Sequence, residues 1–491
     1  MKILTRNILS KYLWIPAFAG MTANFIGCAT FHPKPLSPER TAEAFSARGL
    51  IDPGLQKFLL KASSSAAASG GSMDPGLRPA GMTAFWDLDS LTLAALYYQP
   101  ELDVARAQWQ GARAAQRTAG ERPNPSLALG PTWVSNPDVG MTPWILGFNF
   151  DIPIETAGKR GIRLRQAAAL AEAARQNLAE TAWQVRRRVR AGLLADLAAQ
   201  ESAAILQHQA KALDENARLL SERSASGQAS PLNAAQANLL SGRNRLALED
   251  AERAKSDART QLADAVGVPI SALEGVRLSS SAFTLPDPAD PRLTQTRRAA
   301  LLGRPDLLAA LANYAASEAT LQLEIAKQYP DIHLGPGFAY DQGQNKWSLG
   351  LSFTLPVLSQ NKGPIAEAEA RREEAAARFL VLQDKVINEV DRALAAYQSA
   401  YRKLSAANAV LAQQNNQNRT LQDLLRPGDV SRLTLFRSQL DTDSTALARA
   451  DAFRQAQEAL GALEDALERP LSGAAHLPPE AIEKNPREAG N

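Results

Sequence analysis

Few residues in this chain have the types and the spacing that chemistry needs. The four histidines, His32, His208, His333 and His476, are scattered over 491 residues, and one cysteine alone can build neither a disulfide framework nor a cysteine metal site. No metal-ligand spacing, phosphate-binding loop or nucleophile elbow stands out. Carboxylates are abundant, but on long helices we expect most of them to face solvent. The sequence therefore argues against an enzyme and predicts no cofactor.

The one side chain with a recognisable chemical fate is that of the single cysteine. Three basic residues precede a mostly apolar run over 12–27, which is typical of a secretory signal peptide and too short and interrupted for a membrane span. The run ends in Phe25-Ile26-Gly27-Cys28, which resembles a bacterial lipobox with Phe25 where leucine is usual. We expect Cys28 to be acylated after cleavage; an incidental cysteine at the end of a signal peptide is the alternative.

Composition favours long, closely packed helices. The apolar fraction is 45 % and the aromatic fraction only 6 %, with alanine and leucine dominant. Basic and acidic residues, 54 and 51 in number, are interspersed, and the net charge is +3. No block is basic enough to predict a nucleic-acid partner.

An internal duplication organises the chain from Trp86 onward. Gln-Pro-Glu-Leu at 99–102 returns as Arg-Pro-Asp-Leu at 304–307, and Leu-Gly-Phe-Asn-Phe at 146–150 returns as Leu-Gly-Leu-Ser-Phe at 349–353. Further matches follow in the same order. Such an ordered series predicts two copies of one structural unit.

Each unit is predicted to contain a helix, two strands, a long helix, a turn and a second helix. The segments 145–154 and 347–357 alternate between an apolar face and a small or polar face, and 126–134 and 332–340 are their expected partner strands. Strict alternation fits a membrane-barrel strand. An ordinary half-buried strand alternates equally well.

The helices are predicted to be unusually long. Helices over 158–226 and 364–425 would extend roughly 100 Å and 90 Å at 1.5 Å per residue. A seven-residue apolar spacing on the first of them predicts a coiled-coil seam. The seam consists of Leu164, Ala171, Leu178 and Val185. Each unit should therefore contain a hairpin of long antiparallel helices.

Two basic clusters lie on the first long helix, at 159–165 and at 186–190. The second cluster is expected to form a solvated face or inter-helix ion pairs. The first cluster follows the strands directly, so lipid headgroups and ordinary salt bridges are both open as its partners.

The predicted strands impose a requirement on assembly. Two strand hairpins give four strands per chain, and a four-stranded sheet would leave bare edges in lipid, which is prohibitive. Several chains must therefore combine to close the sheet.

Over about residues 86–468 the chain resembles the TolC-like outer-membrane efflux family, and within it the cobalt-zinc-cadmium branch. The order and duplication of elements match, as does Pro-Asn-Pro-Ser-Leu at 123–127. The segment 151–161 resembles that of heavy-metal members, with Ala157 in place of a glycine. The resemblance implies a mainly α fold with a small membrane β part, in which a trimeric 12-stranded barrel continues into an α-helical periplasmic tunnel.

The same resemblance implies the channel of a tripartite efflux system in the bacterial outer membrane. Its expected partners are two further copies in a homotrimer, a periplasmic adaptor (membrane fusion) protein, an inner-membrane pump of the resistance-nodulation-division (RND) type, and outer-membrane lipid. Heavy-metal cations are the expected cargo, with drug efflux and type I secretion as alternatives. A periplasmic coiled-coil adaptor or scaffold is the rival from another class, which the alternating strand pairs disfavour.

By resemblance, the tips of the helical hairpins contact the adaptor and form the entrance. The tip residues are Gly227, Ser230 and Leu232 in the first unit and Gly428, Ser431 and Leu433 in the second. Their glycines and serines could serve only as helix caps. Many family members carry aspartates after the second turn, where this chain has Thr434 and Arg437. The pore-entrance candidates are therefore Asp429, Thr434 and Arg437.

The chain is expected to divide into six segments. These are a signal peptide with the lipobox cysteine (1–28), an N-terminal arm and low-complexity linker (29–85), the first efflux repeat (86–275), an inter-repeat linker (276–296), the second efflux repeat (297–468) and a flexible C-terminal tail (469–491).

Overall fold

The computed structural model describes residues 31–68, 85–137, 139–290, 296–341, 343–425, 432–471 and 482–483. The chain forms two compact units, residues 1–47 and 48–491. The described part of the first unit contains one short helix, α2 (Pro38–Ser46), which begins with a proline and buries none of its residues. All other elements belong to the second unit.

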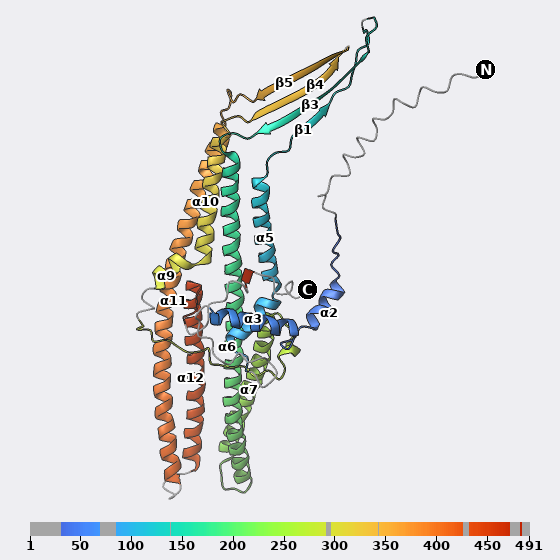
Figure 1. The fold of residues 1–491 in the computed structure, drawn as a ribbon. Coiled ribbons are helices and arrows are strands. Elements are labelled where there is room, and N and C mark those ends of the chain that lie inside the picture. Colours follow the sequence, from blue (N-terminus) through green and yellow to red (C-terminus); the bar gives the residue numbers. More distant parts are fainter. Residues whose placement is uncertain are drawn as a thin grey trace, which may run out of the picture. The chain divides into compact units, whose positions relative to one another are not determined.

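The order of elements in the second unit confirms the predicted duplication (Figure 1). Helix α3 (Pro53–Ala68) comes first, and α4 (Leu88–Tyr98) begins the first repeat. The first repeat continues with α5 (Pro100–Gly120), β1 (Ser126–Leu129), β2 (Thr132–Trp133), β3 (Trp144–Ile154), α6 (Lys159–Ala225) and α7 (Pro231–Val266). The second repeat follows a short 3₁₀ helix, η1 (Ile270–Leu273), and comprises α9 (Thr296–Gly303), α10 (Pro305–Ala326), β4 (Ile332–Asp341), β5 (Gln344–Phe353), α11 (Lys362–Leu425) and α12 (Arg432–Leu467).

One strand ends earlier than the sequence predicts. The apolar alternation suggested a strand over 347–357, but β5 ends at Phe353. The register explains the difference, because Phe353 pairs with Ile332, the first residue of β4, so β5 has no partner on β4 beyond this point. The expected partner strand at 126–134 is divided into the two short strands β1 and β2, both paired with β3.

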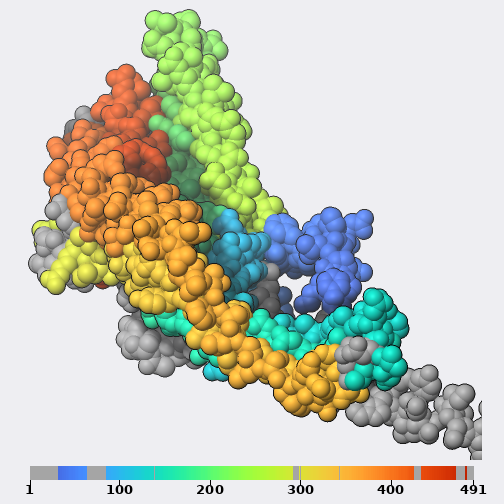
Figure 2. Space-filling view, turned by 90° about the horizontal axis from the view of Figure 1, so that it is seen from above, coloured from blue at the N-terminus to red at the C-terminus, as the bar shows by residue number. Residues whose placement is uncertain are grey.

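The strands of both repeats form one antiparallel sheet in the order β1–β3–β4–β5, with β2 beside the other end of β3. The β3–β4 pair joins the repeats, and there Phe148 lies opposite Phe338. In the space-filling view the teal strands of the first repeat lie against the orange strands of the second (Figure 2). Two half-sheets that would be marginal alone thus stabilise each other.

Four long helices make two hairpins, α6 with α7 and α11 with α12, and α6 also contacts α12 (Figure 1). The shorter helix α10 packs against both α6 and α11, and α5 packs against α6. Of the described helices, none combines the length and the apolar character that crossing a membrane requires.

The predicted seam on α6 is buried except at its start. Ala171, Leu178 and Val185 are at most 4 % exposed, whereas Leu164 is 39 % exposed. Leu164 faces Gly120, the last residue of α5, which covers only part of its side chain. The seam therefore begins one heptad later than the sequence pattern indicates.

The linker between the repeats is bound to both of them. Arg259 on α7 donates hydrogen bonds to the backbone oxygen of Leu273, the last residue of η1, over 2.6 Å and to that of Val276, the first residue of the linker, over 3.2 Å. The Tyr397 hydroxyl on α11 donates to the backbone oxygen of Pro286. These bonds pair linker carbonyls that would otherwise lie unsatisfied against the helices.

Helices α6 and α7 approach closely at Gly192. A Cβ atom added there would lie 3.0 Å from the Cα atom of Leu262 on α7. Since backbone atoms of a packed helix cannot rotate away as a side chain can, a larger residue must push the two helices apart.

We therefore expect Gly192→Leu to destabilise the protein by about 1–3 kcal/mol. The matched control is Gly242→Leu on α7, where an added Cβ meets no described atom within 4 Å. Thermal unfolding followed by circular dichroism should show a lower midpoint for Gly192→Leu and no loss for Gly242→Leu. Equal midpoints for the two variants would contradict this close packing.

Candidate functional site

One face of the sheet presents a continuous apolar surface. On β5, Trp347, Leu349 and Leu351 are 79, 75 and 62 % exposed. The Trp347 ring lies 4.9 Å from that of Phe338 on β4, which lies 5.8 Å from that of Phe148 on β3. Exposed apolar surface of this extent marks contact with a membrane or another protein.

The opposite face is small, polar and crowded. A Cβ atom at Gly337 would lie 2.7 Å from the Ser348 hydroxyl and 2.9 Å from the Asn149 side-chain oxygen. Nearby, Nδ1 of His333 lies 2.9 Å from a carboxylate oxygen of Asp151. Position 337 on β4 therefore needs a glycine, because the polar side chains of the neighbouring strands occupy the space that a Cβ atom would fill.

The outer edges of the sheet are open. In the part of the chain that the structure describes, no strand pairs with the outer edge of β1 or of β5. Each edge therefore presents unpaired backbone N–H and C=O groups, which favour pairing with another strand.

A tight turn joins the sheet to the long helix α6. Ala157 and Gly158 both have positive φ, 53° and 68°. The backbone N–H of Thr156 and Nζ of Lys159 donate to the same oxygen of Asp331, at 2.9 and 2.8 Å. Partial burial alone would raise the pKa of Asp331, but these hydrogen bonds outweigh it and hold that pKa below its usual value.

Basic side chains of the first cluster form ion pairs and a hydrogen bond at and near this turn. Besides the ion pair of Lys159 with Asp331, Arg163 pairs with Glu155. Arg165 donates a hydrogen bond to Gln322 over 2.8 Å. Ordinary salt bridging, one of the two interpretations left open, is confirmed for Lys159 and Arg163.

The first hairpin tip is capped at both helix ends. Gly227 has φ 73°, and the N–H of Gln228 donates to the backbone oxygen of Arg223 over 2.7 Å, which closes α6. The Ser230 hydroxyl accepts from the N–H of Leu232 at 3.2 Å and caps α7. The Leu232 side chain is 65 % exposed. Contact with an adaptor at this tip stays a prediction.

The second tip is described only from α12 onward. Leu433 is 45 % exposed, and Thr434 and Arg437 are also exposed on this first part of α12. Four predicted functional residues lie outside the described residues. They are Cys28, Gly428, Asp429 and Ser431.

A buried ion cluster joins the repeats where α6 meets α12. Arg186 and Arg190 lie 3.6 and 3.3 Å from the Glu464 carboxylate, and all three residues are at most 8 % exposed. An added Cβ at Gly461 would lie 2.2 Å from the Arg190 guanidinium, so this glycine makes room for it. The second basic cluster therefore forms inter-helix ion pairs. This glycine inside a helical pattern is the sequence feature from which the close approach could have been predicted.

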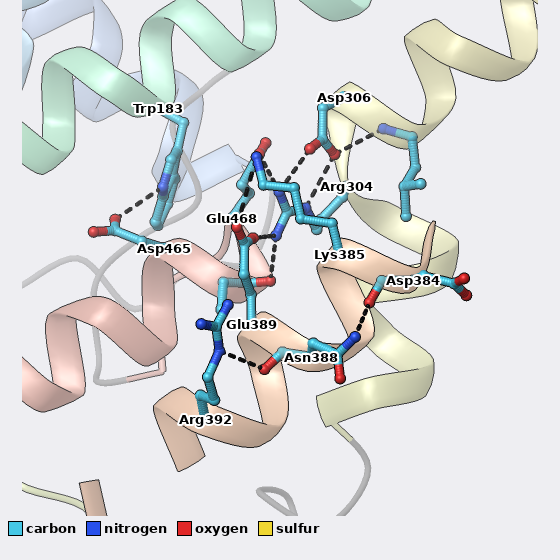
Figure 3. Close-up of polar contacts among 12 residues, drawn as sticks. Trp183, Arg304, Asp306, Asp384, Lys385, Asn388, Glu389, Arg392, Asp465 and Glu468 are labelled. Carbon is cyan, nitrogen blue, oxygen red and sulfur yellow. Dashed lines mark hydrogen bonds and ion pairs between the residues drawn. The ribbon is translucent and has the colours of Figure 1, made fainter. Parts of the chain in front are cut away.

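A second buried node surrounds Arg304 at the start of α10 (Figure 3). Its guanidinium contacts Asp306 at 2.6 Å and Glu389 at 3.3 Å, and donates to the backbone oxygen of Ala466 over 2.9 Å. In the sequence, the Arg-Pro-Asp-Leu motif at 304–307 was visible only as a marker of the repeat.

Within the described residues, no group of three or more His, Cys, Asp or Glu side chains is placed to hold a metal ion.

Comparison with known proteins finds a matching family and a relative of known name. The model of a family described as outer membrane efflux protein matches residues 92–268 and 296–468. The cobalt-zinc-cadmium resistance protein CzcC of Cupriavidus metallidurans is 26 % identical over 232 residues, which are 47 % of this chain and 54 % of that protein. The chain thus matches about half the length of this relative.

Solved structures share the fold at low sequence identity. The outer membrane protein VceC of Vibrio cholerae superimposes with a TM-score of 0.63 at 19 % identity, covering 77 % of this chain and 95 % of VceC. CusC superimposes with a TM-score of 0.62 at 17 % identity, covering 90 % of this chain and all of CusC.

The turn before α6 yields a test. An alanine in the left-handed region destabilises the folded state by about 1–2 kcal/mol. A glycine removes this cost, but it also makes the unfolded chain more flexible, which cancels part of the gain in stability. We expect Ala157→Gly to raise the thermal midpoint slightly. Gly158→Ala should lower it by the equivalent of about 1 kcal/mol, because an alanine there would have to adopt a φ of 68°. Among the described residues, an added Cβ at this position meets nothing within 4 Å, so a steric clash adds nothing to this cost. A lower midpoint for Ala157→Gly, or an unchanged or higher midpoint for Gly158→Ala, would contradict the strained turn.

Proposed function

The chain belongs to the outer membrane efflux protein family, and we propose that it forms the outer-membrane channel of a tripartite efflux system. The observation that carries this proposal is the direct continuity of an exposed apolar sheet face with long helical hairpins. The sheet would contact lipid, and the hairpins would extend into the periplasm. Such a channel gives passive passage, while the pump supplies the energy.

Closure of the sheet supports assembly from several copies. In lipid, the open edges of β1 and β5 must pair, and the edge of a second copy is the partner that also continues the apolar face. Three copies, each with four strand positions across the sheet, would make a twelve-stranded barrel. The crowded glycine-containing face would line its lumen and the aromatic face would meet lipid.

The hairpin tips are proposed as the adaptor-contacting end of the channel. Exposed Leu232 and Leu433 offer apolar contacts beside the caps. The remaining proposed tip residues are Gly227, Ser230, Gly428 and Ser431. Arg437, with Thr434 and Asp429, is proposed to line the entrance, where a cationic side chain would differ from an aspartate ring. Cys28 is proposed as the lipid anchor.

Heavy-metal cations are the proposed cargo, and a pump of the RND type the proposed partner. Support comes from the cobalt-zinc-cadmium resistance relative and from the segment 151–161. Drug efflux and type I secretion are the competing cargo assignments. The six segments defined from the sequence are retained as the proposed domain organisation, with repeats at 86–275 and 297–468.

The orientation of the sheet in lipid can be tested with adjacent residues on β5. Leu349 lies on the apolar face, opposite Pro336, and Ser348 lies on the polar face, opposite Gly337; both are in the middle of β5. A lysine facing lipid at mid-membrane costs about 2–4 kcal/mol, whereas one facing a water-filled lumen costs little. We expect Leu349→Lys to abolish assembly in the outer-membrane fraction and Ser348→Lys to retain it. Tolerance of Leu349→Lys would contradict the proposed lipid face.

The cargo can be tested in a strain that lacks this chain. We expect it to become sensitive to zinc, cobalt and cadmium salts and to regain resistance when the chain is restored. Growth on hydrophobic drugs serves as the comparison. Sensitivity confined to those drugs would contradict metal export while leaving the channel intact.

A further inference from the structure

The two repeats end their last helix with the same backbone geometry but with different charge. The residue directly after α7 is Gly267, with φ 83°, and the residue directly after α12 is Glu468, with φ 47°. The N–H of Val268 donates to the backbone oxygen of Ala263, five residues earlier, and that of Arg469 donates to Glu464 in the same way. The left-handed residue is thus a neutral glycine in one repeat and a carboxylic acid in the other.

The residue that donates from the start of the neighbouring helix to each helix end also differs in charge between the repeats. In the first repeat, Gln99 donates to the backbone oxygens of Asp264 and Ala265, 2.7 and 2.8 Å away. In the second repeat, the corresponding Arg304 donates to the backbone oxygen of Ala466 over 2.9 Å. The repeat-related residue is therefore a neutral amide in one repeat and a charged guanidinium in the other. In the first repeat a different residue, Arg48, donates to the backbone oxygen of Gly267 over 2.8 Å.

Arg304 faces more negative charge than it can neutralise (Figure 3). It binds Asp306 with two nitrogens, at 3.0 and 2.6 Å, and a third nitrogen lies 3.3 Å from Glu389. The Glu468 carboxylate is left at 3.5 Å. One guanidinium therefore serves three carboxylates, and Glu468 has the weakest contact.

Glu468 is also poorly solvated. Its side chain is 7 % exposed, and its buried oxygen Oε2 has no hydrogen-bond partner among the residues that the structure describes. The residue lines a cavity of about 620 Å³ between α6, α11 and α12, where Trp183 donates to the neighbouring Asp465 over 3.1 Å. Burial, followed by the charge of Asp306, raises the pKa of Glu468 to about 8, and burial raises the pKa of Asp465 to about 6.

The other charged groups around this cavity do not remove the imbalance. Lys385 lies 3.7 Å from Glu389, and Arg392 donates to the backbone oxygen of Asn388 over 3.2 Å. The charged side chains that line the cavity are Glu180 and Arg187 from α6, Arg304 and Asp306 at α10, Lys385, Glu389 and Arg392 from α11, and Asp465 and Glu468 at the end of α12. Five carboxylates face four cations, so an added proton would balance the formal charge.

We propose that the carboxyl group of Glu468 is a proton-binding site, and that loss of its proton loosens the junction between the end of α12 and Arg304. Once ionised, Glu468 competes with Asp306 and Glu389 for one guanidinium, which weakens the bond of that guanidinium to Ala466. In the first repeat, the position that corresponds to Glu468 is Gly267, which carries no carboxyl group. The inference concerns the junction itself and does not depend on the channel function.

The sign of the effect follows from proton linkage. A folded-state pKa above the unfolded value means that the stabilising contribution is full below the unfolded pKa and is lost as pH rises through about 8. The last turn of α12 should therefore open less often at pH 6 than at pH 9. The last turn of α7 should open equally often at both pH values.

Hydrogen–deuterium exchange of the purified full-length protein in detergent tests the proposal, with rates corrected for the intrinsic effect of pH. We expect the opening equilibrium of the last turn of α12 to increase by about tenfold or more between pH 6 and pH 9, since one pKa unit corresponds to a factor of ten. The last turn of α7 is the internal reference. An α12 end that follows the α7 end at every pH would overturn the proposal.

Three variants separate proton binding from a merely structural role. Glu468→Gln keeps the shape and should remove the pH dependence while keeping the α12 end protected. The pair Arg304→Gln with Glu468→Gly transplants the cap of the first repeat and should do the same. Asp465→Asn, which removes a neighbouring negative charge, should move the midpoint of the wild-type response to lower pH. Unchanged pH dependence in Glu468→Gln would overturn the assignment.

Discussion

Backbone hydrogen bonding at the edges of the sheet is the constraint on which the rest of this structure depends. In lipid, every N–H and C=O group must find a partner within protein. The pairs β1–β3, β3–β4 and β4–β5 meet this requirement inside the chain but leave the outer edges of β1 and β5 open. A chain with such a sheet and with an exposed ladder of aromatic side chains is incomplete alone. The proposed assembly of several copies follows from this incompleteness, and the number three is what the resemblance to the efflux family implies.

The duplication resolves the next problem, which is how a short sheet remains attached to helices of more than sixty residues. Each repeat passes from strand to helix through a turn, and the first of these turns is held by Asp331 from the other repeat. Further along, Arg186 and Arg190 of α6 bind Glu464 of α12 in a buried cluster. Breaking one partner of such a cluster would leave an uncompensated charge, so these contacts fix the repeats side by side.

Local signals explain what the sequence predicted well. Gly227 and Ser230 mark a turn through backbone conformation and capping, and the alternation on β3 and β5 follows from the two-residue period of a strand. The exposure of Leu164, the end of β5 at Phe353 and the burial of Glu468 depend on which distant residue lies opposite, which no local pattern contains. The Arg-Pro-Asp motif was visible as a repeat, but its role required the packed end of α12.

The mass of the assembly extracted from the outer membrane tests the central claim most directly. Native mass spectrometry of the detergent-solubilised protein should give three times the mass of the processed chain, because three copies are proposed to close one sheet. A monomer of stable mass, recovered from the periplasmic fraction without detergent, would contradict the account, because its open strand edges and apolar face would then need neither lipid nor a second copy.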